Sequence, residues 1–348
     1  MKAWTLYDVG DIRLGEAEKP APAAGEALVK VSAVGICGSD IPRIYQTGAH
    51  RHPLIPGHEF SGVVEALGER VKTSWLGKRV GIFPLIPCKS CEPCREQHYE
   101  MCKDYNYLGS RCDGGFAEYA LVPEWNLVEL PEGVGMDVAA MLEPMAVAAH
   151  AMRRVSLKKD SQIAVIGLGT IGMFLLMFLK EAGYERVYGV GNKEFQKQNA
   201  LALGLREKDY CDSRKQNTPE WIQNQTAGQG ADVIFECVGR NETAAWAVAA
   251  AGPLGQVVFL GNPFSDMSFP RDIYWKILRS QLTVRGTWNS SYTQSEEDDW
   301  RYVLERIADG RIHPEQMISH RLPLERLEEG LLIMRDKKED YGKIMLEP

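Results

Sequence analysis

The stretch "SQIAVIGLGTIGMFLLMFLKEAG", residues 161–183, places a short apolar strand directly before a glycine-rich turn and an apolar helix. Its glycines follow the G-x-G-x-x-G spacing, which is weak evidence alone. Between a strand and a helix, however, the glycines let the backbone approach a pyrophosphate at the positive end of the helix. We therefore expect a bound dinucleotide here, and a tight turn without a ligand is the alternative. The residues expected to contact it are Gly167, Gly169, Thr170, Ile171 and Gly172.

Three further strand-like runs follow this turn: "ERVYGV" (185–190), "ADVIFECVG" (231–239) and "GQVVFLG" (255–261). They alternate with helical stretches, which predicts an α/β domain with a doubly wound parallel sheet of the Rossmann type over residues 150–287. Ligands of such sheets bind at the carboxyl ends of the strands. Gly239 and Gly261, which end two of the runs, are therefore expected to contact the cofactor.

The end of the second strand bears on the choice between NAD and NADP. An NAD enzyme usually carries an acidic residue there for the ribose hydroxyls, whereas this chain reads "GVGNKE" with Gly191 at that position. Asn192 and Lys193 follow, and the lysine could pair with a 2′-phosphate. The pattern favours NADP, although the nearby Glu194 keeps NAD open, as does the possibility that Lys193 is a solvated charge at a helix start.

Four cysteines fall within fifteen residues in "CKSCEPCREQHYEMC", residues 88–102. Two-residue gaps let a tight loop direct successive thiolates at one ion, and four sulfur ligands close a zinc tetrahedron without an open position. Cys88, Cys91, Cys94 and Cys102 are therefore predicted to hold a structural zinc. A redox dithiol or unligated thiols are the alternatives.

A second metal site could be assembled from three separate segments: "GICGSD" (35–40), "PGHEFSG" (56–62) and "LEPMAVAAH" (142–150). Cys37, His58 and Glu143 would supply a thiolate, an imidazole and a carboxylate. Such a mixed set leaves a coordination position for water or substrate. Each residue taken alone is more often structural, so the segments need further support.

That support is a resemblance along essentially the whole chain. The three segments, the cysteine lobe and "DGGFAEY" (113–119) resemble the zinc-dependent medium-chain alcohol and polyol dehydrogenases. Within that family the likeness is greatest to the galactitol-1-phosphate 5-dehydrogenases and their relatives, through residues 37–62 and 107–119.

The resemblance implies two zinc ions per chain, one structural and one catalytic, with the catalytic zinc held by Cys37, His58 and Glu143. Glu59 would lie against it as an outer or exchangeable ligand. It also implies a GroES-like, twisted β-barrel catalytic domain formed by residues 1–149 and 288–348, with an active site between the two domains.

The same resemblance gives Ser39 the role of accepting the substrate's hydroxyl proton as a hydride leaves for the nicotinamide. A turn serine is the structural alternative. In many relatives a histidine continues the proton path five residues after the cysteine ligand, and here that position is Pro42, which cannot carry a proton. His50 and His52 lie nearby in sequence but are expected to be surface residues.

The resemblance implies a small-molecule substrate, a sugar alcohol or its phosphate oxidised at a secondary hydroxyl, with a free polyol such as sorbitol or iditol as the alternative. A phosphate would need positive charge near the site. The basic candidates are Arg43, Arg51, Arg111 and Lys276, each of which could equally be a surface residue.

Composition limits the other possibilities. The chain has 348 residues, 45% of them hydrophobic, and a net charge of -7 without a basic block, which argues against nucleic-acid or membrane-surface binding. No apolar run reaches the roughly eighteen residues of a membrane span, and we expect a cytoplasmic protein.

Family resemblance implies a homodimer or homotetramer. A zinc-ribbon binding protein without catalysis and a zinc-free reductase are the competing classes.

Overall fold

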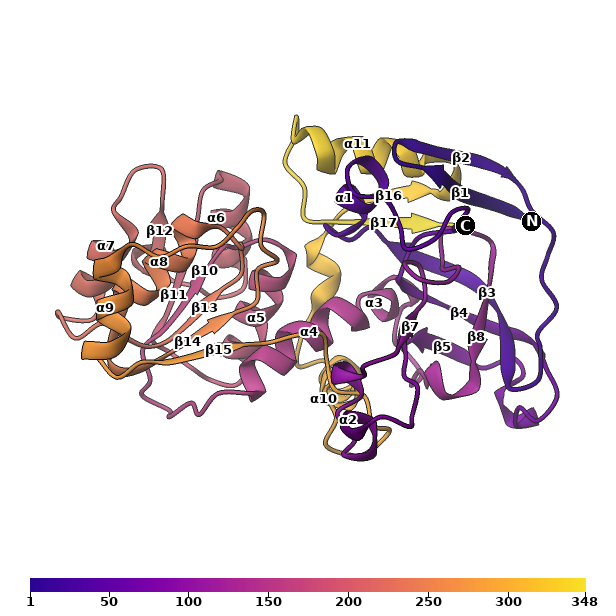
Figure 1. Cartoon of the computed structure of the whole chain (residues 1–348), viewed down its shortest axis with the longest axis horizontal. Helices are drawn as coiled ribbons and strands as arrows, with labels where there is room; N and C mark the ends of the chain where they lie inside the picture. Colours follow the sequence, from indigo (N-terminus) through magenta and orange to yellow (C-terminus); the bar gives the residue numbers. More distant parts are fainter. The chain divides into compact units, whose positions relative to one another are not determined.

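The structure is a computed structural model that describes residues 1–348, and the chain divides into two compact units. The first unit contains Met1–Ala146 and Ser290–Pro348, and the second contains Val147–Asn289. Figure 1 shows the last segment, in yellow, returning to the N-terminal strands, in indigo. That the first unit is catalytic and the second binds the dinucleotide stays a prediction at this stage.

The second unit contains a six-stranded sheet in which every neighbouring pair is parallel. Its order is β12-β11-β10-β13-β14-β15. Strands after β10 are therefore added first on one side of it and then, from β13 onward, on the other side. This is the strand order of a doubly wound Rossmann sheet, which confirms the predicted fold class. The strands are β10 (Ile163–Ile166), β11 (Val187–Gly191), β12 (Tyr210–Asp212), β13 (Ala231–Glu236), β14 (Ala251–Phe259) and β15 (Thr283–Gly286).

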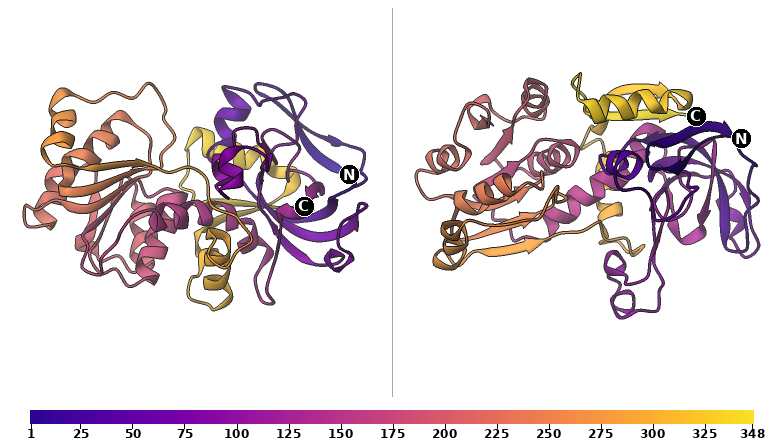
Figure 2. Two further views of the ribbon diagram at one scale, coloured as in Figure 1. Left: turned by 60° about the horizontal axis from the view of Figure 1, so that its bottom comes forward. Right: turned by 45° about the horizontal axis from the view of Figure 1, so that its top comes forward.

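Helices cover both sides of this sheet (Figure 2). One group packs on β10 and β11 and the other on β13 and β14, so all four side chains of β10 are buried. Strands buried on both faces read as continuous apolar runs, which explains "IAVI" in β10. The helices are α5 (Thr170–Glu181), α6 (Glu194–Ala202), α7 (Thr218–Gln225), α8 (Asn241–Ala250) and α9 (Arg271–Arg279).

The first unit is built around a seven-stranded sheet, β16-β17-β3-β4-β5-β9, with β8 also paired to β3. Only β16 and β17 pair in parallel, so the sheet is mostly antiparallel. The strands of the first unit are β1 (Lys2–Asp8), β2 (Asp11–Glu16), β3 (Glu26–Gly35), β4 (Glu59–Leu67), β5 (Arg79–Ile82), β6 (Leu85–Ile86), β7 (Asn106–Tyr107), β8 (Tyr119–Pro123), β9 (Leu127–Glu129), β16 (Ile318–Pro323) and β17 (Lys343–Glu347).

Short helices connect these strands. They are α1 (Asp40–Tyr45), α2 (Glu92–Arg95), α3 (Met136–Ala140), α10 (Asp299–Ala308) and α11 (Leu327–Asp336), while α4 (Leu142–Arg153) runs across the boundary between the units. No helix in the structure has both the length and the apolar character needed to cross a membrane.

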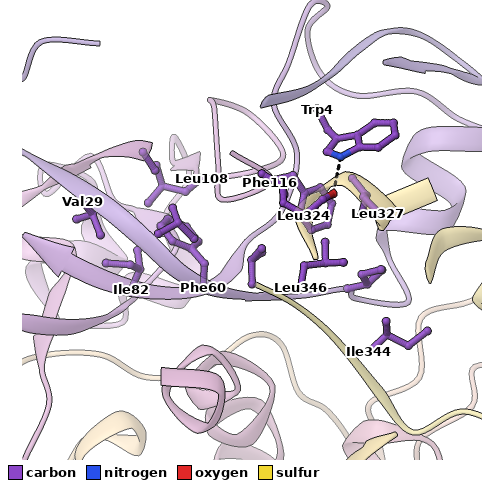
Figure 3. Close-up of a cluster of buried hydrophobic side chains, with 14 of the residues drawn as sticks. Trp4, Val29, Phe60, Ile82, Leu108, Phe116, Leu324, Leu327, Ile344 and Leu346 are labelled. Atoms are coloured by element: carbon purple, nitrogen blue, oxygen red, sulfur yellow. Dashed lines mark hydrogen bonds between the residues drawn. The ribbon is translucent and has the colours of Figure 1, made fainter. Parts of the chain in front are cut away.

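The core of the first unit joins the two ends of the chain (Figure 3). Side chains from the N-terminal strands, such as Phe60, pack with Leu324 and Leu346 from the last segment. The indole N–H of Trp4 donates a hydrogen bond of 2.7 Å to the carbonyl of Leu324. Burial of these side chains anchors β17 beside β3, which positions the candidate site described below.

Candidate active site and metal centres

The pairing of β3 with β4 brings two of the predicted metal-binding segments together. Gly35, the last residue of β3, lies opposite Glu59, the first residue of β4. Cys37 follows two residues after β3, and His58 immediately precedes β4. The donor atoms of Cys37, His58 and Glu59 all lie within 4.8 Å of one another. That spacing is compatible with one ion bound about 2.0–2.3 Å from each donor.

The turn before β4 needs glycine for its backbone. Gly57 has a φ of 93°, a conformation that residues with a Cβ rarely adopt, and it places His58 and Glu59 in the interior. Only 4% of His58 and 1% of Glu59 is exposed. "PGHE" is thus a turn that delivers a buried imidazole and a buried carboxylate to one place.

Asp40 orients His58. The Asp40 side chain is fully buried, its Oδ1 lies 3.6 Å from His58 Nδ1, and its Oδ2 accepts a hydrogen bond of 3.0 Å from the Cys37 backbone N–H. Burial alone would lower the pKa of His58, but the nearby negative charges of Cys37 and Asp40 raise it well above the usual value. A carboxylate behind a ligating histidine fixes ring orientation in many metal sites.

Ser39 lies beside the cysteine. Its hydroxyl donates a hydrogen bond of 3.3 Å to Cys37 Sγ, and the residue is half-buried. Pro42 lies within α1, where it offers no proton-carrying group. The geometry therefore puts a hydroxyl next to the predicted metal and leaves its catalytic role a prediction.

Glu143 is near this group but is not part of its compact set. It is buried in the first turn of α4, where its Oε1 accepts a hydrogen bond of 3.0 Å from the Tyr107 hydroxyl. Burial raises the pKa of Glu143, His58 opposes the shift and Glu59 adds to it, so the three groups are close in space. The structure thus brings Glu59 closest to Cys37 and His58, and the assignment of Glu143 as third ligand stays a prediction.

Two residues of this region have no signal in the local sequence. Tyr107 packs edge-on against the His58 ring, with ring centres 5.9 Å apart, besides contacting Glu143. Lys343, at the start of β17, forms a buried ion pair with Glu59. Asp40, by contrast, lies three residues after Cys37 in "CGSD", and its position next to the cysteine could have indicated its role.

The charges of the region suit a divalent cation. Four buried or half-buried acidic groups, Cys37, Asp40, Glu59 and Glu143, face two cations, Lys343 and Arg43. With all four acids ionised, an ion of charge +2 would bring the sum to zero. Uncompensated charges are costly in a protein interior, so the residues present fit a metal such as zinc.

The four-cysteine lobe is assembled as the sequence spacing predicts. The Sγ atoms of Cys88, Cys91, Cys94 and Cys102 lie within 4.8 Å of one another, and none of these cysteines is in a disulfide. Hydrogen bonds from Ser90 lower the pKa of Cys88 to about 5, which favours its thiolate, whereas burial raises the pKa of Cys94 to about 12. The donor set is that of a closed zinc site.

In the second unit, the glycine-rich turn has the geometry of a nucleotide site. Gly167, directly after β10, has a φ of 96° that requires glycine. Gly169 precedes α5, and a Cβ on it would meet no atom within 4 Å, so the backbone is open to a ligand there. Thr170, Ile171 and Gly172 form the first turn of α5, whose N–H groups can bind a phosphate.

The other predicted cofactor residues lie at the same edge of the sheet. Gly239 and Gly261 follow β13 and β14 and pack backbone to backbone. Gly191 ends β11, and a Cβ there would lie 2.7 Å from the Tyr210 hydroxyl and 2.9 Å from Gln196 Oε1. The position where an NAD enzyme usually carries an acidic residue thus has little space for a side chain.

Asn192 and Lys193 connect β11 to α6. The Asn192 N–H donates to Gln196 Oε1 at 3.0 Å, and the Lys193 carbonyl accepts from Tyr210 at 3.1 Å. The next strand, β12, ends beside β11 at Asp212, which pairs with Arg214 at 2.7 Å. Arg214 is thus a basic residue close to the end of β11, and it could not be identified from the residues that directly follow β11 in the sequence.

Comparison with known proteins agrees with this geometry. Residues 23–132 match the family described as "Alcohol dehydrogenase GroES-like domain", and residues 170–309 match "Zinc-binding dehydrogenase". The chain is 31% identical over 342 residues to galactitol 1-phosphate 5-dehydrogenase of Escherichia coli K12, covering 97% of both sequences. The chain belongs to the zinc-dependent medium-chain alcohol and polyol dehydrogenases.

Two solved structures resemble this dehydrogenase over nearly their full length. A zinc-binding dehydrogenase of Sinorhizobium meliloti 1021 bound to NADP has a TM-score of 0.90 at 27% identity, covering 100% of this chain and 99% of that one. A protein of Escherichia coli CFT073 described as a short chain alcohol dehydrogenase, in complex with NADH, has a TM-score of 0.90 at 26% identity and the same coverage.

Family membership settles the class of protein. The chain is an oxidoreductase that acts on CH–OH groups with NAD(P), and its first unit carries the GroES-like domain. The alternative of a non-catalytic zinc ribbon is therefore wrong as a description of the whole chain.

Proposed function

We propose that this dehydrogenase oxidises a secondary hydroxyl of a sugar alcohol phosphate, similar to galactitol 1-phosphate, and passes the hydride to NAD(P). The observation that carries the proposal is the compact group of Cys37, His58 and Glu59 donors, within 4.8 Å of one another. Zinc bound there would lower the pKa of a coordinated alcohol, so that its alkoxide forms near neutral pH. The proposed ligands are Cys37, His58 and Glu143, with Glu59 as an outer or exchangeable ligand, so that one coordination position stays open for the substrate.

The chain's own residues orient the ligands and remove the proton. Asp40 fixes the ring of His58, and Tyr107 fixes the carboxylate of Glu143 through its hydrogen bond of 3.0 Å. The Ser39 hydroxyl accepts the proton of the substrate. Because Ser39 is half-buried, the proton can pass from it to water, which makes the missing histidine at Pro42 unnecessary.

A phosphorylated substrate is supported by a basic cluster in the first unit. The Tyr107 ring lies against His58, and the ring centres of Tyr105 and Tyr107 are 6.3 Å apart. The guanidinium carbon of Arg111 lies 4.2 Å from the centre of the Tyr105 ring. No carboxylate pairs with Arg111. Burial lowers the pKa of His50, and the positive charges of Arg111 and Arg43 lower it further, so these three side chains are close together.

The other two basic candidates fit less well. Arg51 forms an ion pair of 2.7 Å with Asp113, with both side chains about half exposed. Lys276 is on α9 in the second unit. Arg111, which has no carboxylate partner, therefore favours a phosphate ester over a free polyol such as sorbitol or iditol, which is the second candidate substrate class.

We infer NADP as the preferred cofactor. The acidic residue that would repel a 2′-phosphate is absent at Gly191, where a Cβ would crowd Tyr210. Lys193 supplies positive charge after β11, whereas Arg214, after β12, is already paired with Asp212. Solved relatives with NADP and with NADH both exist, so family membership alone does not choose between the two cofactors.

We further propose two zinc ions per chain and a homodimer. The four-cysteine lobe would hold the second, structural zinc. Support for a dimer comes from the second unit, where Tyr274, Trp275 and Leu278 form an apolar face on α9 and are each more than half exposed. The edge strand β15 follows α9 and pairs only with β14.

The test is an activity screen of sugar alcohols and their phosphates with both cofactors, combined with metal analysis. We expect two zinc ions per chain, and higher kcat/KM for a polyol phosphate with NADP than for any free polyol. Activity with free polyols alone would favour the sorbitol-type alternative. A fully folded protein with one zinc and no polyol activity would contradict the proposal.

A further inference from the structure

A lysine from the far end of the chain is buried against the candidate metal site. Lys343 is the first residue of β17, and its side chain is 2% exposed. Its ammonium forms an ion pair with Glu59 Oε2 and donates a hydrogen bond of 3.0 Å to the carbonyl of Ile36. Ile36 directly precedes Cys37, so the lysine touches both segments that supply the predicted ligands.

Three adjacent strands produce this arrangement. β17 pairs with β3, and β3 pairs with β4, with Gly35 opposite Glu59. A Cβ on Gly35 would lie 2.5 Å from Glu59 Oε2 and 2.7 Å from Lys343 Cε. The glycine therefore leaves the space in which the carboxylate and the ammonium meet, and a larger residue would separate them.

The Glu59 carboxylate has two possible partners. It is within 4.8 Å of the donor atoms of Cys37 and His58, close enough to join a metal bound by them, and it is already paired with Lys343. Burying a carboxylate without a counter-charge is costly, so the lysine stabilises Glu59 whether or not it binds metal. Lys343 therefore holds, through Oε2, a carboxylate that lies close enough to reach a metal bound by Cys37 and His58.

We propose that Lys343 is a positioning residue that holds the Glu59 carboxylate and restrains its approach to a metal bound by Cys37 and His58. This rests on the proposed function. Without the ammonium, Glu59 would take up the coordination position that the substrate hydroxyl needs. Lys343 thus keeps one face of the metal open, in addition to compensating the charge of the carboxylate.

The test uses cobalt in place of zinc, because the visible spectrum of cobalt reports its coordination. The variants are Lys343→Met, Lys343→Arg, Glu59→Gln and the double variant Lys343→Met/Glu59→Gln. Lys78→Met is the matched control, because Lys78 pairs with Glu129 at 2.5 Å on the surface of the same unit. The measurements are metal per chain, the cobalt spectrum, kcat, KM and thermal stability.

For Lys343→Met we expect an altered cobalt spectrum and a kcat lower by about 10-fold or more, the usual effect of removing an outer partner of a metal ligand. Lys343→Arg should keep most of the activity. In the Glu59→Gln background, Lys343→Met should change kcat and the spectrum little, since its target carboxylate is gone. Lys78→Met should behave like the wild type.

Two results would overturn the proposal. One is a folded Lys343→Met with the wild-type spectrum and kcat; the other is an equal effect of Lys343→Met with and without Glu59. If Lys343→Met does not fold, Lys343→Arg and the double variant Lys343→Met/Glu59→Gln still test the proposal. An altered cobalt spectrum in Lys343→Arg alone would refute it. Equal losses of kcat in Lys343→Arg and in the double variant would also refute it. A wild type that carries no more metal than Cys37→Ala would instead reject the metal site itself, and with it the role of Lys343.

Discussion

At the scale of single residues, the two predicted metal groups place cysteine in different environments. Cys37 lies beside a hydroxyl, a histidine and two carboxylates, whereas Cys88 lies among three other cysteines, with a serine hydroxyl and backbone donors around it. A thiolate with mixed neighbours leaves room for a substrate, and a thiolate among four sulfurs does not. The same substitution should therefore have different consequences at the two sites.

Cys37→Ala should abolish turnover while leaving the fold intact. The variant removes one ligand of a site within the preformed strands β3 and β4, so we expect kcat/KM to fall by at least about 100-fold. The melting temperature and NADP binding should remain close to those of the wild type. Steady-state kinetics, calorimetry and cofactor titration measure these quantities. Substantial activity in a folded Cys37→Ala would contradict the ligand assignment.

Arg111→Gln should separate phosphorylated from free substrates. Losing the guanidinium should raise KM for a polyol phosphate by about 10-fold or more, because a charge-assisted hydrogen bond contributes roughly 1.5–3 kcal/mol. The kcat/KM for a free polyol should hardly change. Arg51→Gln is the control, since Arg51 is already paired with Asp113. Equal losses on both substrate classes would remove Arg111 from phosphate binding.

At the scale of elements, features set by adjacent residues could be predicted from the sequence more readily than contacts between residues far apart in it. β10 and α5 were predictable because an apolar run, a glycine turn and an apolar helix are contiguous in the sequence. The cysteine lobe was predictable for the same reason. The grouping of Cys37 with His58 required a family resemblance, because only the register of β3 with β4 brings them together.

Long-range partners could not be predicted in this way. The ion pair of Lys343 with Glu59 depends on β17 returning to the first unit, and "GKIMLEP" carries no mark of a metal site. Likewise, nothing in the sequence distinguished Glu59 from Glu143 as the carboxylate nearest to Cys37. Side-chain direction at the end of a strand and at the start of a helix decides this, and it follows from packing.

The lobe that contains Cys91 should depend on its metal for stability. Its only regular elements are α2, with four residues, and η2 (Tyr99–Met101), with three, which are too short to be stable alone. Cys91→Ala should therefore lower the free energy of unfolding by several kcal/mol, on the order seen for structural zinc sites. Zinc content should fall by one per chain.

Thermal unfolding and metal analysis of Cys91→Ala test this expectation. Cys211→Ala is a useful control for the loss of a buried cysteine, since Cys211 lies in β12 and belongs to neither metal group. A Cys91→Ala protein with the wild-type melting temperature and zinc content would show that the lobe does not need a metal.

At the scale of the whole molecule, the chain forms its first unit from both ends and its second unit from the middle. Trp4, near the N-terminus, donates a hydrogen bond to Leu324 in the last segment, so the first unit draws on residues from both sides of the second. The expected boundaries at 149/150 and 287/288 rested on the short strands and turns of the first part of the chain and on the family resemblance. Composition indicates where an element starts, but the return of β17 to β3 is a property of the assembled sheet.

The homodimer proposal is also a property of the whole molecule. Monomeric proteins rarely expose a large contiguous apolar surface, yet Tyr274, Trp275 and Leu278 are 57%, 55% and 51% exposed on one face of α9. The neighbouring edge strand β15 has free backbone groups along one side, which in a monomer would risk aggregation. A second copy would cover both features.

The double substitution Trp275→Glu/Leu278→Glu should therefore convert a dimer into a monomer. Two carboxylates placed in an apolar interface lose their hydration without gaining partners, which should weaken association by about 100-fold or more. Sedimentation velocity over a range of protein concentrations measures this. Leu76→Glu, on an exposed leucine of the first unit, is the matched control and should leave the dimer intact. A wild type that sediments as a monomer at all concentrations, or a variant that stays dimeric, would show that α9 is not the contact surface.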